Sequence, residues 1–143
     1  ILNKLLKNIE FLNNNRKYYF LFISSRRTDE NFIKIIRDRF QNKFFVWDKI
    51  EENPYLYSLK ISDYFIVTSD STSMISELSF TGKPVFIYHL PFKRVSRRLE
   101  RFHHDFHKKG ITKPFIENIY SWSYNHLDES KRIAGILKTR ILK

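Results

Sequence analysis

The sequence predicts a doubly wound α/β domain with a parallel sheet, and three features of the chain lead to this prediction. Short apolar runs alternate with segments whose apolar residues recur at helical spacing. The predicted strands lie about 20–26 residues apart, which leaves room for the helical crossovers that parallel strands need. The apolar runs are also continuous, as in strands that are buried on both faces of a sheet.

Composition limits the class of protein. The chain has 143 residues, 42% of them hydrophobic and 17% aromatic, which is enough for one domain with a hydrophobic core and excludes a disordered chain. It has no cysteine, so disulfides and thiolate chemistry are excluded. No apolar run reaches the roughly 18–20 residues that cross a bilayer. The formal net charge of +11 favours an anionic partner, although a Lys-, Asn- and Ile-rich composition accounts for it equally well.

The first half of the chain predicts helices and strands in alternation. Residues 1–15 predict a helix, and residues 18–23 (YYFLFI) predict a strand buried on both faces. Thr28 is the expected cap of a helix, and residues 44–47 are a second short strand. Asn53 and Pro54 are the expected start of a short helix. Two of these helices have predicted apolar faces: Leu2, Leu5, Leu6, Ile9 and Leu12 on the first, and Phe32, Ile33, Ile36 and Phe40 on the second.

The segment 63–90 is the centre of the prediction. Residues 64–67 predict a strand, the turn TSDSTS follows, and residues 85–88 predict the next strand. Asp70 or Ser71 is the expected N-cap of the intervening helix, where a side-chain oxygen can accept a backbone N–H. A helix N-terminus directly after a parallel strand presents free N–H groups to an anion. An ordinary capped crossover is the alternative interpretation.

After Pro91 the sequence predicts a basic amphipathic helix over residues 95–109, an extended segment, and a last helix from about Asp128. The basic helix suits an anionic membrane surface or a phosphate site, and the alternative is a core-packed helix with a solvated basic face. His103 and His107 are four residues apart, but no third metal ligand is evident. We therefore interpret them as ordinary surface histidines and predict no metal site.

Two loops at the carboxyl ends of predicted strands carry the candidate binding residues, because doubly wound sheets bind ligands at that edge. The loop SSRRT has two arginines, which suit bidentate contact with phosphate or are solvated loop charges. Neither a GxGxxG nor a P-loop pattern follows any strand. Glu77 lies four residues after Ser73 on one helix face, an arrangement that suits a nucleotide diphosphate and its ribose diol.

Several segments carry a resemblance to a known family: SSRRT, ENPYLYSLKISDYFIVTSDSTSMISELSFTGKPVFIY, RRLERFHHDF, KGITKPF and SWSY. From about Ser24 to Ala134 the chain resembles the mitochondrial-fission-type family of glycosyltransferase-like proteins. Its members are mostly bacterial, with plant relatives implicated in mitochondrial division. The resemblance covers the C-terminal half of a family member. Residues 1–143 are thus expected to be one domain of a longer two-domain chain.

The resemblance implies a Rossmann-like domain of the GT-B C-terminal type, which binds a nucleoside-diphosphate-sugar without a metal or another cofactor. The resemblance implies that Glu77 binds the ribose hydroxyls of the nucleotide. The diphosphate would lie against two sets of residues: Ser71, Thr72 and Ser73 in the central turn, and Ser25, Arg26 and Arg27 in the first loop. The chain departs from the family pattern at residues 60–63, where KISD replaces Ala-Asp, and at residues 48–52, which lack glycine.

Three functions follow as hypotheses. The first is the donor-binding half of a glycosyltransferase-like protein, inactive without its own N-terminal domain, with its catalytic residues unassigned. The second is a non-catalytic module that binds anionic membranes through residues 94–109, with Arg97, Arg98 and Arg101 as the contact residues. Nucleic-acid binding ranks last, because general basicity is its only support. The expected location is the cytoplasm, with a peripheral position at the inner membrane face under the second hypothesis.

Overall fold

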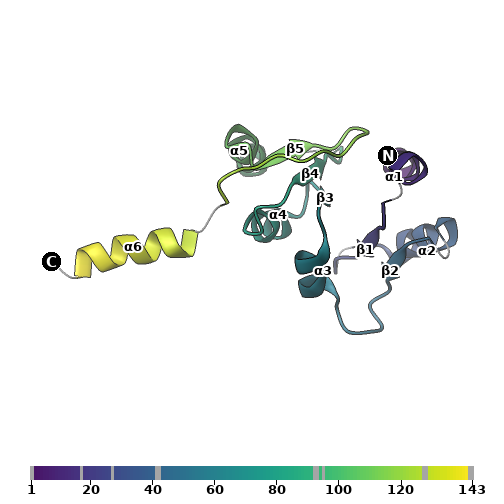
Figure 1. The fold of residues 1–143 in the computed structure, drawn as a ribbon, viewed down its shortest axis with the longest axis horizontal. Coiled ribbons are helices and arrows are strands. Elements are labelled where there is room, and N and C mark those ends of the chain that lie inside the picture. The colour runs from purple at the N-terminus through teal and green to yellow at the C-terminus, as the bar shows by residue number, and fades with distance from the viewer. Residues whose placement is uncertain are drawn as a thin grey trace. The chain divides into compact units, whose positions relative to one another are not determined.

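The computed structural model describes residues 2–16, 18–26, 28–40, 43–91, 94, 96–126 and 129–141. Helices and strands alternate along the chain, as Figure 1 shows. In order, the elements are α1 (Leu2–Arg16), β1 (Leu21–Ile23), α2 (Glu30–Arg39), β2 (Phe45–Trp47), α3 (Tyr55–Ile61), β3 (Phe65–Thr68), α4 (Thr72–Ser79), β4 (Val85–Tyr88), α5 (Arg97–Lys108), β5 (Thr112–Pro114) and α6 (Glu129–Ile141). The predicted α/β class with parallel strands is confirmed.

The chain divides into two compact units, Ile1–Asp63 with Ile116–Asn118, and Tyr64–Phe115 with Ile119–Lys143. In the first unit β1 and β2 form a parallel pair, with Leu21 opposite Phe45 and Ile23 opposite Trp47. Helix α2 packs against β2. The predicted apolar faces of α1 and α2 are confirmed, because their central residues are buried: Leu5, Leu6, Ile9, Leu12, Ile33, Ile36 and Phe40.

The first predicted strand is shorter and more exposed than expected. Residues 18–23 were predicted as one strand buried on both faces, but β1 covers only Leu21–Ile23. Tyr19 is 97% exposed and Leu21 is 40% exposed. Strand β1 pairs only with β2 among the described strands, and none of its residues is fully buried: Leu21 is exposed, and Phe22 and Ile23 are half-buried. A continuous apolar run therefore gave a wrong prediction of burial here.

Two helix starts in the first unit lie slightly further along the chain than predicted. Asp29, and not Thr28, is the N-cap of α2, and its carboxylate accepts a hydrogen bond from the N–H of Asn31 at 2.7 Å. Thr28 lies one residue before the cap, and its hydroxyl oxygen accepts the N–H of Ser25. Helix α3 begins at Tyr55, whose N–H donates to the side chain of Asn53 at 3.0 Å. The N-cap of α3 is therefore Pro54 and not Asn53, although the Asn53 side chain still accepts a backbone N–H at the start of the helix.

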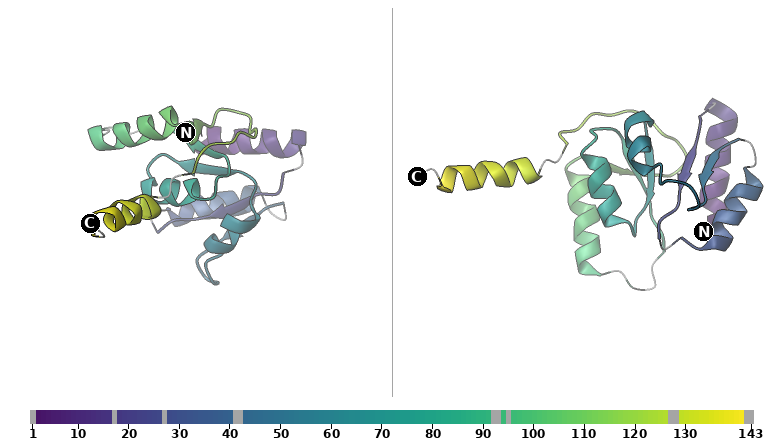
Figure 2. Two further views of the ribbon diagram at one scale, coloured as in Figure 1. Left: turned by 60° about the vertical axis from the view of Figure 1, so that its left-hand side comes forward. Right: turned by 90° about the horizontal axis from the view of Figure 1, so that it is seen from below.

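The second unit is built on a three-stranded parallel sheet in the order β3-β4-β5 (Figure 2). All four residues of the central strand β4 are buried, as predicted. Strand β3 covers Phe65–Thr68, one residue later than expected at each end, and pairs with β4 from Phe65 opposite Val85 to Thr68 opposite Tyr88. Helix α4 packs against β3 and β4, and α5 packs against β5.

Aromatic rings fill the core of this unit around Phe86. The side chain of Phe86 is fully buried, and the rings of Phe115, Tyr120 and Trp122 lie edge-on to it at centroid distances of 6.3, 5.4 and 5.0 Å. The indole N–H of Trp122 donates to the carbonyl oxygen of Gly110 at 2.8 Å. The loop after β5 is therefore fixed to the sheet, although it contains no regular structure.

Helix α5 is shorter than the predicted basic helix of residues 95–109. It starts at Arg97, because Ser96 is extended and its hydroxyl accepts the N–H of Leu99 at 3.2 Å. Its C-terminus is a Schellman motif, in which Gly110 has a φ of +70° and the N–H of Ile111 donates to the carbonyl of Phe106. Gly110 ends the helix as predicted, and Val95 lies outside the described residues.

Helix α6 begins near the predicted position, although Asp128 itself lies outside the described residues. Its apolar residues Ile133, Ile136 and Leu137 are 42–51% exposed. Among the helices that the structure describes, none combines the length and the apolar composition that a bilayer span requires.

Candidate functional site

The N-terminus of α4 directly follows β3, at the carboxyl edge of the three-stranded sheet. Ser71 is the N-cap, as predicted, but its side chain accepts no hydrogen bond from the helix. With φ −97° and ψ 63°, Ser71 lacks the extended backbone that points a capping hydroxyl at the first turn, so the expected side-chain cap is absent. The N–H groups of Thr72, Ser73 and Met74 have no acceptor among the described residues. They are open donors for an oxyanion.

The side chains of the predicted site lie on this helix. Ser73 and Glu77 are both exposed, and their spacing places them on one face. Thr72 is half-buried, and its carbonyl oxygen accepts the hydroxyl of Ser76 at 3.0 Å. The α4 terminus thus offers amide donors, an exposed hydroxyl, and a carboxylate one turn further along. These groups can bind an oxyanion and a diol.

Asp70 introduces a negative charge into the same turn. Its Oδ1 atom is buried and has no hydrogen-bond partner among the described residues. Of the two predicted N-cap candidates, Asp70 and Ser71, the structure has Ser71, and no side chain caps α4. A carboxylate at this turn opposes the binding of an anion.

Ser69 connects the turn to two other elements. It is 1% exposed, its N–H donates to Tyr88 at 3.1 Å, and its hydroxyl oxygen accepts the N–H of Leu90 at 3.0 Å. Its carbonyl oxygen lies 2.7 Å from Nε2 of His103 on α5. Nothing in the sequence distinguishes Ser69, because one serine in a serine-rich turn carries no distinct signal.

Histidines gather at the same edge of the sheet. His89 directly follows β4, and its ring centroid lies 5.4 Å from that of His103. Partial desolvation lowers the pKa of His89, although the residue as a whole is exposed, and the nearby charges of His103 and His107 lower it further. The interpretation of His103 as an ordinary surface histidine is wrong, because its ring is half-buried and hydrogen-bonded. Within the described ranges, no group of three or more potential ligands is arranged to hold a metal.

The loop after β1 belongs to the first unit. The N–H of Ser25 donates to Thr28 Oγ1 at 2.9 Å, and the N–H of Thr28 donates to the carbonyl of Ser25 at 3.1 Å. These bonds close a turn that leaves Arg26 exposed. Arg27, the third phosphate-binding residue predicted in this loop, lies outside the described residues.

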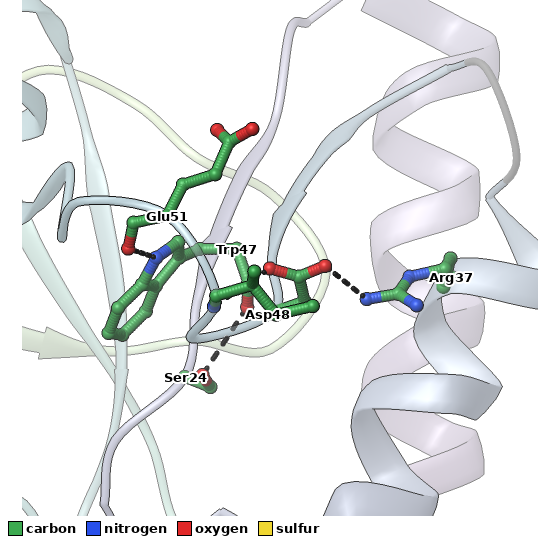
Figure 3. Close-up of polar contacts among 6 residues, drawn as sticks. Ser24, Arg37, Trp47, Asp48 and Glu51 are labelled. Carbon is green, nitrogen blue, oxygen red and sulfur yellow. Dashed lines mark hydrogen bonds and ion pairs between the residues drawn. The ribbon is translucent and has the colours of Figure 1, made fainter.

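The loop after β2 is ordered by polar contacts at the same end of the first sheet (Figure 3). The indole N–H of Trp47 donates to the carbonyl of Glu51 at 3.1 Å, and the hydroxyl of Ser24 donates to the carbonyl of Trp47 at 3.4 Å. Arg37 and Asp48 form an ion pair at 3.1 Å. This is the glycine-free segment noted in the sequence, and Lys49 adopts the left-handed conformation there, with φ 69°.

The predicted anionic-surface residues lie on α5. Arg97, Arg98 and Arg101 are all exposed, and none of the residues of α5 is fully buried. The apolar stripe of the helix is half-buried, as the exposures of Leu99, Phe102 and Phe106 indicate. The basic side chains are thus accessible to an anionic surface or to solvent.

Comparisons with known proteins cover most of the chain. The family model described as "Mitochondrial fission ELM1" matches residues 1–141. The "Mitochondrial fission protein ELM1" of Arabidopsis thaliana is 34% identical over 102 residues, which are 69% of this chain and 23% of that protein. The "Uncharacterized protein RP120" of Rickettsia prowazekii (strain Madrid E) is 33% identical over 126 residues, 82% of this chain and 35% of that protein. The chain thus spans about a third or less of these relatives. No solved structure matches it.

Proposed function

The chain belongs to the mitochondrial fission ELM1 family, and from this premise we propose that it is the nucleotide-sugar-binding part of a GT-B glycosyltransferase-like protein. Under this proposal residues 1–143 form one Rossmann-like domain of the C-terminal type, within a longer protein. The acceptor site and the catalytic base lie in the remainder of that protein, so this chain alone binds nucleotide and transfers no sugar. The protein is proposed to act in the cytoplasm.

The uncapped N-terminus of α4 is the observation that carries the proposal. The N–H groups of residues 72–74 have no acceptor among the described residues, and Ser71–Ser73 add hydroxyl groups beside them. A diphosphate bound there would complete the first turn of the helix and would interact favourably with its dipole. Glu77 is exposed one turn further along, where its carboxylate can accept both hydroxyls of a ribose.

The proposal is tested by thermal-shift and ligand-observed NMR titrations of this chain with nucleoside diphosphates and nucleotide sugars, with EDTA present. We expect nucleotides of one base type to bind. Glu77→Ala should lower their affinity about tenfold, because the hydrogen bonds to the ribose are lost. Ser73→Ala should lower the affinity for the nucleoside diphosphate without changing the affinity for the free nucleoside. Glu117→Ala and Ser123→Ala are matched controls, because both residues are exposed and lie off α4. Unchanged affinity in Glu77→Ala would overturn the ribose assignment.

The predicted role of Ser25, Arg26 and Arg27 is tested separately. Arg26 is exposed, and a guanidinium contact to phosphate typically contributes about 1.5–3 kcal/mol. Arg26→Ala should therefore lower the affinity for a nucleoside diphosphate more than it lowers the affinity for the corresponding nucleoside. An equal loss of affinity for both ligands would exclude a contact between Arg26 and the phosphates.

A second candidate function rests on α5. Its exposed Arg97, Arg98 and Arg101 can bind the headgroups of anionic lipids, each contributing about 1 kcal/mol near a membrane surface. Co-sedimentation with phosphatidylserine vesicles, lost in the triple alanine variant and at high salt, would support it. Equal binding to uncharged vesicles would contradict it. Under this second proposal the chain is a non-catalytic interaction module at the inner membrane face.

A further inference from the structure

Two histidines of the second unit, His89 and His103, lie at the carboxyl edge of the sheet beside the α4 terminus. Because Thr68 pairs with Tyr88, the next residues, Ser69 and His89, emerge together from adjacent strands. His103 reaches this edge from α5, where its Nε2 lies 2.7 Å from the carbonyl oxygen of Ser69. His107 is one turn further along α5, on the same helix face. We name His89, His103 and His107 the histidine cluster.

The hydrogen bond to Ser69 fixes the chemistry of one ring. A carbonyl oxygen only accepts, so Nε2 of His103 must carry its hydrogen. In the neutral ring Nδ1 is then the acceptor, and protonation adds a donor at that atom. The ring of His89 stands at 68° to that of His103, with 5.4 Å between centroids, and has no hydrogen-bond partner among the described residues. Both rings therefore have nitrogen atoms available to a ligand.

The charges around the cluster favour an anionic ligand. The charges of His103 and His107 both disfavour protonation of His89 and so lower its pKa. An anion between the rings would offset this effect and gain charge-assisted hydrogen bonds. Two carboxylates act against it: Asp70 on the turn after β3, and Glu100, which shares the helix face of His103 and His107.

We propose that the histidine cluster is a phosphate-binding subsite that takes up protons when it binds, and that it recognises the distal phosphate of the diphosphate assigned above to the α4 terminus. This inference rests on the proposed function for its ligand, but the cluster can be tested on its own. The chemical class is a phosphate oxyanion. The bound proton makes the subsite selective for a dianion over a neutral hydroxyl group.

The first experiment uses anions that carry no nucleoside. Ring resonances of each histidine are followed by NMR during titration with sulfate, a dianion throughout the pH range, and with pyrophosphate, with EDTA present. We expect sulfate to shift the resonances of His89 and His103 and to bind up to about tenfold more tightly for each pH unit from 8 to 6 when one proton is taken up. His89→Gln and His107→Gln should weaken this dependence, and Asp70→Asn and Glu100→Gln should strengthen binding.

His104→Gln is the matched control. His104 lies on the same helix but is exposed and pairs with Asp105 at 3.6 Å, so its loss should leave anion binding unchanged. His103→Gln tests the histidine that is bonded to Ser69, because a glutamine amide can still donate to the Ser69 carbonyl but cannot take up a proton. If His103→Gln fails to fold, His89→Gln, at an exposed position, decides the question.

The outcomes separate this inference from the proposed function. Binding of a nucleoside diphosphate that is insensitive to pH and to His89→Gln would overturn the histidine subsite and leave the nucleotide proposal standing. If sulfate and pyrophosphate bind with uptake of protons but no nucleotide binds, the histidine subsite is supported and the proposal of nucleotide binding is contradicted. A lipid phosphate is the other source of the same chemistry, and vesicles containing phosphatidic acid, competed by sulfate, would identify it. No histidine response to any anion would refute the subsite.

Discussion

Ser69 and His103 are joined by a 2.7 Å hydrogen bond between a backbone carbonyl and an imidazole, 34 residues apart in the chain. The hydroxyl of Ser69 holds the chain after β4 at the same time, through the N–H of Leu90. The turn after β3 is thus fixed by α5 and by the end of β4, although no side chain caps the helix that it starts. A fixed turn with open amide donors is the arrangement expected of a preorganised binding site, because no donor has to be released from a protein partner.

Ser69→Ala should lower the free energy of unfolding by about 1–2 kcal/mol, because it leaves the N–H of Leu90 without its acceptor in a part-buried position. The carbonyl that receives His103 is unchanged in this variant. Urea denaturation measures the effect, and Ser123→Ala, at an exposed serine, is the control. Equal stability of the two variants would show that the Ser69 hydroxyl contributes nothing to the fold.

Tyr124 should make the fold sensitive to alkaline pH. Burial raises the pKa of Tyr124 to about 12 from 10.0, although a hydrogen bond with Thr81 acts in the opposite direction. The folded state therefore holds this proton more tightly than the unfolded state. The resulting stability is complete below pH 10 and is lost as pH rises toward about 12.

The measurement compares the free energy of unfolding of the wild type and Tyr124→Phe at about pH 8 and about pH 11. At the lower pH the variant should lose about 0.5–1.5 kcal/mol, because the phenol donates to the carbonyl of Lys83 at 2.8 Å. Between the two values the wild type should lose about 1 kcal/mol more than the variant, after allowance for partial exposure. Parallel pH curves would contradict the altered ionisation of Tyr124.

Local signals in the sequence predicted most elements, and long-range partners account for what it missed. The run VFIY predicted a buried strand correctly, because β4 has a neighbour on each side. The similar run YYFLFI did not, since β1 pairs with β2 alone among the described strands. Residue type cannot reveal the number of neighbours a strand will have. For the same reason His103 resembled a surface residue, because its partner Ser69 is brought to it only by the fold.

The candidate site was predictable to a similar degree. The turn after β3 could be located from its hydroxyl residues, and the N-cap could be narrowed to Asp70 or Ser71, of which the structure has Ser71. Whether Ser71 also capped the helix depended on its ψ angle, which composition does not determine. The roles of Ser71–Ser73, Glu77 and the first loop remain predictions until ligand binding is measured.

The ion pair between Glu10 and Arg39 should contribute a small, pH-dependent stabilisation of the first unit. Arg39 contacts both carboxylate oxygens of Glu10, at 2.6 and 2.8 Å, and this hydrogen bonding lowers the pKa of Glu10 below 4.5. The stabilisation is present above pH 4.5 and is lost as pH falls through the lowered value. Because the pair is largely solvated, Glu10→Gln should cost only about 0.3–1 kcal/mol at neutral pH.

A double-mutant cycle with Arg39→Gln isolates the interaction between Glu10 and Arg39. The coupling energy should decrease in high salt and disappear in acid. A coupling that persists under both conditions would show that packing, and not charge, connects the two helices at this point.

Lys49→Gly should stabilise the protein, which is unusual for a substitution by glycine. Lys49 has a φ of 69°, where a residue with a Cβ atom costs roughly 1–2 kcal/mol relative to the right-handed region. Glycine removes this strain and loses about 0.5–1 kcal/mol through its greater freedom in the unfolded chain. The ammonium group of Lys49 also donates to the carbonyl of Thr28 at 3.3 Å, but this contact is exposed and weak. The expected net gain is about 0.5 kcal/mol.

Urea denaturation of Lys49→Gly and Lys49→Ala separates the backbone effect from the loss of the ammonium group. Both variants remove the contact to Thr28, but only glycine relieves the left-handed backbone, so the alanine variant should be no more stable than the wild type. The turn should persist in both, because the carboxylate of Asp48 still accepts the N–H of Ile50 at 3.1 Å. Equal stability of the two variants would mean that residue 49 is unstrained in solution, and that the loop after β2 needs no glycine.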